Sequence, residues 1–222
     1  MIAEPMTLLT DYALAAVSGY SGWRLLLRRE AQASRRWWAI AFGGLACAAA
    51  LGGTHHGFAP LMNSTVAQLV WKLTVLGIGA FSFGMVAGSA VAVTTGALRH
   101  VVLAAAGVKL AGFWAWMLAH DEYRYVIVDT AAAMTALVVL HGWSYAARRD
   151  RASAWTLAAV AVSGVAAAVQ ASGFALHQHF NHNDLYHVIQ IAAMTLFYKG
   201  ATLLRDHLPS SPRLQHQRFE SS

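Results

Sequence analysis

Residues 66–95 read VAQLVWKLTVLGIGAFSFGMVAGSAVAVTT, thirty positions that hold a single ionisable side chain, Lys72. The run lacks the alternation of apolar and polar residues that marks a half-exposed β-strand. A helix needs about 20 apolar residues to cross a hydrocarbon core of about 30 Å. Because backbone amides in lipid must find their partners within the segment, an apolar run of this length predicts a membrane-spanning helix.

Six similar apolar runs accompany this one, so the sequence predicts seven transmembrane helices. We expect them at residues 6–27, 37–56, 66–95, 98–118, 125–146, 155–176 and 185–204. Of the 222 residues, 57% are hydrophobic and 12% are charged, whereas about 25% are charged in soluble domains. The predicted fold class is all-α: one polytopic membrane domain over residues 1–206, followed by a polar tail over residues 207–222 that we expect to be disordered.

Basic residues gather in alternate connections, and this predicts the orientation of the helices. Five arginines between residues 24 and 36 surround the first connection, others lie in the third, the fifth and the tail, and the opposite loops hold only Arg124. By the positive-inside rule the N-terminus lies outside and the C-terminus in the cytoplasm. The net charge of +6 is therefore a topology signal. We expect an integral protein of a bacterial inner membrane that contacts membrane lipid and no nucleic acid.

Polar side chains recur at similar depths near the non-cytoplasmic ends of six expected helices. Ionisable groups are costly inside a bilayer, so a cluster of them predicts a functional site. Residues three or four positions apart share a helix face, which places Gln68 with Lys72, and Asp184 with His187 and Gln190. The full set is Asp11, His55, His56, Gln68, Lys72, Asp129, Gln170, Ser172, Asp184, His187 and Gln190.

A metal site is the first chemistry that this polar layer can support. Imidazole and carboxylate groups bind zinc, and a catalytic zinc keeps one position open for water. We predict zinc ligands among His55, His56, Asp184 and His187. Adjacent helical residues point roughly 100° apart, so His55 and His56 are not both expected to face inward.

Bound zinc would activate a water molecule and polarise a carbonyl group, which predicts a hydrolase of a lipid amide or ester. Asp11, Asp129 or Asp184 would act as the general base. Thr54 would help to hold the oxyanion of the reaction.

An ion-pair network is the second chemistry, and it predicts a receptor, sensor or ion-translocating protein instead of an enzyme. Lys72, with Gln68 and Gln190 nearby, would occupy the pocket and pair with Asp11, Asp129 or Asp184. Lys109 lies near the middle of the fourth expected helix, and Asp129 on the next helix is its expected partner.

Gly84 and Gly88 form a small-xxx-small pair in the third expected helix. Such pairs allow two helices to approach closely. The contact is expected inside the monomer, and a homo-oligomer through small-residue helix faces is the alternative.

Three segments resemble the superfamily of alkaline ceramidases and progestin/adipoQ receptors. Residues 3–11, AEPMTLLTD, are similar to its Ala-Glu-Pro opening, residues 52–56, GGTHH, fall where it has Ser-x-x-x-His, and residues 183–187, NDLYH, are similar to the His-x-x-x-His that begins its seventh helix. The resemblance implies a seven-helix hydrolase, or a hydrolase-like receptor, with a zinc site. The chain departs from the pattern at Gly52, four positions before His56, and at Asn183, which replaces the first histidine.

Overall fold

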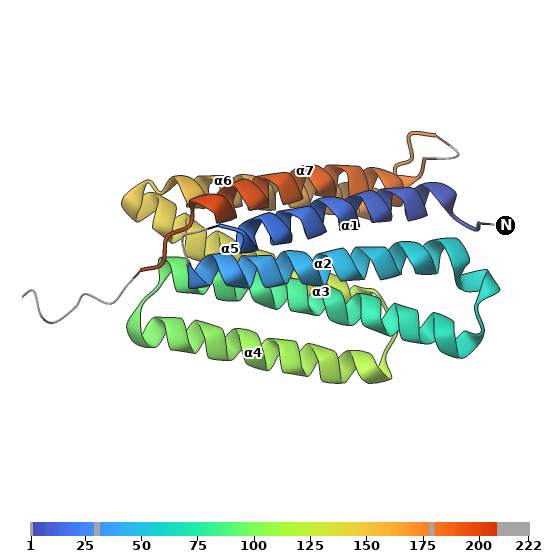
Figure 1. Cartoon of the computed structure of the whole chain (residues 1–222), viewed down its shortest axis with the longest axis horizontal. Helices are drawn as coiled ribbons and strands as arrows, with labels where there is room; N and C mark the ends of the chain where they lie inside the picture. The colour runs from blue at the N-terminus through green and yellow to red at the C-terminus, as the bar shows by residue number, and fades with distance from the viewer. Residues whose placement is uncertain (1, 29–31, 178–179, 208–222) are drawn as a thin grey trace, which may run out of the picture.

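The computed structural model describes residues 2–28, 32–177 and 180–207. Over these residues the chain forms seven α-helices that alternate in direction, and it contains no β-strand (Figure 1). The all-α prediction is confirmed, whereas the polar tail lies outside the described residues from 208 onward. The elements are α1 (Pro5–Leu26), α2 (Ala33–Phe58), the 3-10 helix η1 (Ala59–Leu61), α3 (Ser64–Val93), α4 (Gly96–Ala119), α5 (Arg124–Arg148), α6 (Arg151–Ser172) and α7 (His182–Leu203).

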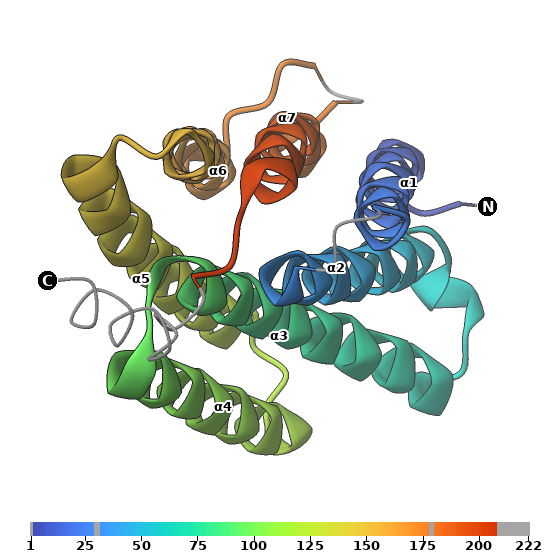
Figure 2. The same ribbon diagram turned by 60° about the vertical axis from the view of Figure 1, so that its left-hand side comes forward.

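Six of the helices close a ring, and α4 lies outside it (Figure 2). Contacts join α1 to α2, α2 to α3, α3 to α5, α5 to α6, α6 to α7, and α7 back to α1. The ring thus skips α4, which packs mainly on α3 and buries only Ala106, Phe113 and Met117. Every helix except α4 therefore borders the interior of the ring.

Five helical segments, from α2 to α6, are long and apolar enough to cross a membrane. At 22 residues each, α1 and α7 match the length of α6. These two helices are not among the five, and they carry polar residues predicted for the site: Asp11 in α1, and Asp184 and His187 in α7. The outer faces expose apolar side chains such as Val108, at 75%, and Val128, at 67%. Such surfaces favour contact with lipid.

The bounds predicted for the sixth helix, residues 155–176, are wrong, because α6 begins and ends about one turn earlier. Asp150 caps its start: the carboxylate accepts hydrogen bonds from the amides of Ala152 and Ser153, at 3.0 and 3.2 Å. Gly173 ends it with a φ of +66°, in the left-handed region that suits glycine. A hydropathy profile does not detect the cap at Asp150 or the turn at Gly173, because these act through local hydrogen bonds and backbone conformation.

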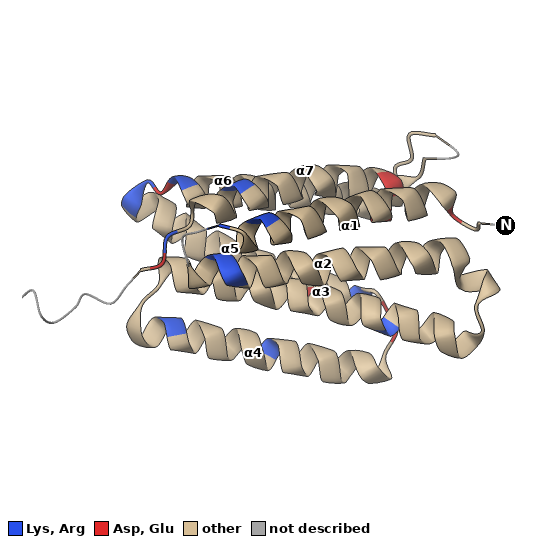
Figure 3. Cartoon of the chain, in the orientation of Figure 1, with Lys and Arg blue, Asp and Glu red and all other residues tan. Residues whose placement is uncertain are grey.

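Basic residues gather at one end of the bundle, which we call the arginine end and define by Arg24, Arg36, Arg99 and Arg148 (Figure 3). The opposite end, called the site end, holds the first turns of α1, α3, α5 and α7. At the arginine end, Asp206 accepts hydrogen bonds from the amides of Ala33 and Ser34 at the start of α2. The segment that follows α7 thereby ties the last helix to the second.

Glycines allow α2 and α3 to approach closely. A Cβ atom at Gly84 would lie 2.9 Å from the carbonyl oxygen of Trp37 and from the amide nitrogen of Ala41. One at Gly88 would lie 2.9 Å from the carbonyl oxygen of Ser34. This small-residue pair is therefore used inside the monomer, as expected. A homo-oligomer through other small-residue faces stays a prediction.

Gly84→Ala should destabilise the fold by about 1–3 kcal/mol, because backbone atoms of α2 cannot move aside for the added methyl group. Gly43→Ala is the matched control, since nothing lies within 4 Å of its Cβ position. Thermal unfolding of both variants in one detergent measures the difference. Equal melting temperatures would contradict the close packing of α2 on α3.

Candidate functional site

A cavity of about 260 Å³ lies inside the six-helix ring, toward the site end. All six helices of the ring contribute lining residues, and none of the described lining residues comes from α4. Its apolar wall comes largely from α2 and α3, with Leu45, Ala48, Ala49, Ile78 and Phe81. Its polar lining residues are Asp11, His56, Thr74, Tyr123, Thr130, Gln170, Asn183, Tyr186, His187 and Gln190.

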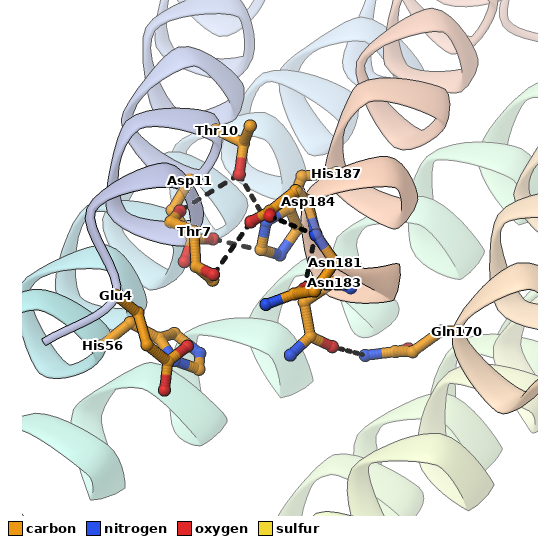
Figure 4. A network of polar contacts seen from close by, with 10 residues as sticks. All are labelled: Glu4, Thr7, Thr10, Asp11, His56, Gln170, Asn181, Asn183, Asp184 and His187. Atoms are coloured by element: carbon orange, nitrogen blue, oxygen red, sulfur yellow. Dashed lines mark hydrogen bonds and ion pairs between the residues drawn. The ribbon is translucent and has the colours of Figure 1, made fainter. Parts of the chain in front are cut away.

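His187 joins α7 to α1 through both of its ring nitrogens (Figure 4). Its Nδ1 lies 3.1 Å from Thr10 Oγ1, and its Nε2 lies 3.3 Å from Asp11 Oδ1. All three residues are buried. The contacts fix the imidazole ring and hold one carboxylate oxygen of Asp11 against it.

The other carboxylate oxygen of Asp11, Oδ2, is buried and has no hydrogen-bond partner among the described residues. Asp11 lines the cavity, and its Oδ2 lies 3.8 Å from the position that a Cβ atom on Gly52 would take. A buried acceptor without a donor costs about 1–3 kcal/mol. A residue that lines the cavity therefore has a buried carboxylate oxygen without a donor among the described residues.

Glycine at position 53 allows Asp11 to reach this place. A Cβ atom at Gly53 would lie 2.8 Å from Asp11 Cβ and 3.2 Å from the carbonyl oxygen of Leu8. Larger residues would push α1 away from α2. The sequence Gly52-Gly53 thus leaves space beside the carboxylate at one position and allows helix contact at the next.

Asp184 works as a helix cap, although its sequence position predicts a metal ligand. One carboxylate oxygen accepts a hydrogen bond from the Asn181 amide at 2.7 Å, and Asn181 caps the amide of Asp184 in return. The other oxygen accepts a hydrogen bond from the Thr7 hydroxyl at 2.8 Å. Both oxygens are occupied, so Asp184 fixes the start of α7 against α1.

The predicted site residues other than Asp184 and Lys72 fall into three groups. Asp11, His56, His187 and Gln190 line the cavity. His55 and Gln68 line a separate open pocket with Trp71 and Asp121. Thr54 bonds to the Ala50 carbonyl oxygen and to Tyr12, and Asp129 bonds to Lys109, so neither of them lines the cavity.

The predicted pairing of Lys72 with Asp11, Asp129 or Asp184 is wrong. Its ammonium group binds Asp121 at 2.6 Å and the carbonyl oxygens of Met117 and His120. Lys72 lies on the outward side of α3, where α4 packs, and so turns away from the interior of the ring. The predicted pair of Lys109 with Asp129 is confirmed, and it joins α4 to α5.

The residues predicted to bind zinc are spread over different environments. Across residues 2–28, 32–177 and 180–207, no group of three His, Cys, Asp or Glu side chains is placed to hold a metal ion. His55 faces the second pocket, Asp184 caps α7, and His187 contacts Thr10 and Asp11. This donor set does not fit a zinc ion as arranged, so zinc stays a prediction that the geometry does not support.

Sequence reasoning missed several residues of the site. Thr7 and Thr10 contact α7, and Glu4 Oε2 lies 3.1 Å from His56 Nδ1 at the edge of the cavity. Tyr123, another residue that lines the cavity, was also missed. Burial raises the pKa of its hydroxyl group to about 12, and the negative charge of Asp11 contributes a smaller part of this increase. A usable signal existed for α1, because Thr7, Thr10 and Asp11 share one helix face by their spacing.

The chain matches the model of a family described as "Family of unknown function (DUF6962)" over residues 6–206, and it belongs to that family. No curated protein and no solved structure matches it. The resemblance to alkaline ceramidases and progestin/adipoQ receptors therefore stays a prediction.

The contact between Thr7 and Asp184 can be measured with a double-mutant cycle. Thr7→Val and Asp184→Ala should each destabilise the protein, and their effects should fall short of additivity by about 0.5–3 kcal/mol, because each removes the same buried hydrogen bond. Thr195→Val is the control for Thr7→Val, since the Thr195 hydroxyl bonds only to the Ile191 carbonyl oxygen within α7. Thermal unfolding measures all variants. Additive effects of Thr7→Val and Asp184→Ala would disprove the contact.

Proposed function

We propose that this member of the DUF6962 family is a seven-helix integral membrane protein that binds a small ligand near its non-cytoplasmic face, as a receptor, sensor or transport protein. The observation that carries this proposal is Asp11, a lining residue of the cavity inside the helix ring whose buried Oδ2 atom has no hydrogen-bond partner among the described residues. Ligand sites in helical bundles are typically apolar hollows with a few fixed polar groups, and this cavity has that composition.

Oδ2 of Asp11 needs a donor in either of two arrangements of the proton shared with His187, both of which leave Oδ2 unprotonated. If His187 Nε2 donates to Asp11 Oδ1, Thr10 donates to Nδ1 and the carboxylate is charged. If Asp11 carries the proton on Oδ1, His187 donates from Nδ1 to Thr10, which donates to the Thr7 carbonyl oxygen 3.1 Å away. Oδ2 remains an acceptor without a donor in both cases, so a bound molecule that donates there gains affinity.

Hydrolysis of a lipid amide or ester receives less support from the same residues. The described donors do not converge on a metal position. Thr54, predicted to hold an oxyanion, bonds instead to its own helix and to Tyr12, and it is not among the lining residues. Of the two functions that the sequence leaves open, ligand binding without chemistry is the one that the geometry favours.

For the topology, we propose that all seven helices cross a bacterial inner membrane, with the arginine end in the cytoplasm. The segregation of basic residues to that end supports this orientation (Figure 3). α1 and α7 direct Thr7, Thr10 and Asp11 toward Asp184 and His187, so their polar groups face protein. This removes the main cost of placing such helices in lipid.

The orientation predicts which engineered cysteines react in intact cells. In a Cys47→Ala background, Ser64→Cys at the site end should react with a membrane-impermeant maleimide, whereas Arg151→Cys at the arginine end should react only after the membrane is permeabilised. Both positions are exposed, so burial does not explain a difference between them. The reverse pattern of labelling would refute the proposed orientation.

The cavity itself is tested by reducing its volume without disturbing the fold. A methyl group at Gly52 would meet Thr74 Cγ2 at 3.5 Å and Asp11 Oδ2 at 3.8 Å, which are ordinary contacts. Gly52→Ala should keep the wild-type melting temperature and lose the stabilisation by compounds that bind in the cavity, whereas Gly43→Ala should retain it. A thermal-shift screen of small amines, alcohols and carboxylic acids supplies the compounds; a ligand present at 100 times its Kd stabilises by about 2.7 kcal/mol. If no compound distinguishes Gly52→Ala from Gly43→Ala, the cavity is not a binding site.

A further inference from the structure

Carboxyl groups lie in and beside the cavity, and no lysine or arginine among its described lining residues pairs with them. Asp11 lines the cavity, Glu4 lies beside the lining residue His56, and Asp184 lies one turn before His187. No lysine or arginine occurs among the described residues that line the cavity. Histidine side chains are the only basic groups there, and one of them, His187, already contacts Asp11.

The basic side chains at the site end have acidic partners elsewhere. Lys72 binds Asp121, at 2.6 Å, and two backbone carbonyl oxygens. Arg124 binds Glu122, at 3.1 Å, and both residues are largely exposed. Neither cation reaches Asp11. A cation from outside the chain would therefore find a carboxyl group that contacts His187 but neither Lys72 nor Arg124, in surroundings of low dielectric where attraction to a charged carboxylate is strong.

Aromatic rings supply the second part of a cation site. Trp71, Phe81, Tyr123 and Tyr186 line the same cavity as Asp11, and they come from different parts of the ring. The faces of aromatic rings attract cations, most strongly when the ion is desolvated. Small residues of α2 beside them, Ala48, Ala49 and Gly52, leave room for carbon groups.

We infer that the ligand of this cavity is an organic ammonium ion, whose cationic head contacts Asp11 Oδ2 and whose carbon groups pack against Trp71, Tyr123 and Tyr186. This inference rests on the proposed function and narrows it to one class of ligand. Organic ammonium groups occur in free amines and in the headgroups of choline and ethanolamine lipids. All of them carry the positive charge that the aromatic rings attract, and those with N–H groups can in addition donate a hydrogen bond to Asp11 Oδ2.

The test compares choline with 3,3-dimethylbutan-1-ol, a neutral molecule of nearly the same shape. Protein purified in a maltoside detergent, which contains no ammonium group, is titrated with each probe by calorimetry. Choline should bind at least about tenfold more tightly than the alcohol, because only choline gains the charge and aromatic interactions. The same titration compares lysophosphatidylcholine with lysophosphatidylglycerol, which has no ammonium group. Tighter binding of lysophosphatidylcholine would identify a lipid as the source of the ligand.

Asp11→Asn should remove the preference for the cation, and Asp121→Asn, which changes a carboxylate outside the cavity, should keep it. Gly52→Ala, which retains Asp11, should abolish binding of both probes and serves if Asp11→Asn fails to fold. Equal binding of choline and its neutral analogue, still blocked by Gly52→Ala, would overturn the ammonium inference and leave the binding cavity intact. Absence of binding by choline and by lysophosphatidylcholine overturns the ammonium inference too, and the screen with Gly52→Ala and Gly43→Ala then decides separately on the cavity.

Discussion

The contact of the first helix with the last is the constraint on which the rest of the structure depends. Three side chains of α1 face α7, where Thr7 binds Asp184 while Thr10 and Asp11 bind His187. They close the ring of helices together with smaller links from α7 and the segment that follows it to α2, among them the hydrogen bonds of Asp206 at the start of α2. Polar groups in lipid are stable only when they are paired, so the interaction that closes the ring also determines which faces of α1 and α7 turn inward.

The same contacts divide the carboxylates into structural and available ones. Asp184 uses both oxygens to cap α7 and to bind Thr7, and Asp129 binds Lys109 on the outer helix α4. Asp11 uses one oxygen for His187, and its other oxygen has no hydrogen-bond partner among the described residues. Oδ2 of Asp129 lacks a partner as well, but of the three aspartates only Asp11 is among the described residues that line the cavity.

Hydropathy was sufficient to predict the helices, because a long apolar run such as residues 66–95 has one stable structure in lipid. It also predicted that Asp11, His56 and His187 share a pocket, since depth along a helix follows from residue number. Hydropathy did not predict that Lys72 points away from the cavity. Its direction depends on the rotation of α3 about its axis and on the position of α4 outside the ring. Which helices become neighbours is a tertiary property, and in this chain α3 contacts α5 across the sequence order.

The position of α4 has a consequence for how this architecture can vary. α4 rests on α3 and is joined to α5 by one ion pair, but it supplies none of the described residues that line the cavity. The length, composition and outward surface of α4 can therefore change during evolution with little effect on the cavity. Related chains are free to adapt this helix to a different bilayer thickness or to a neighbouring subunit while the cavity stays the same.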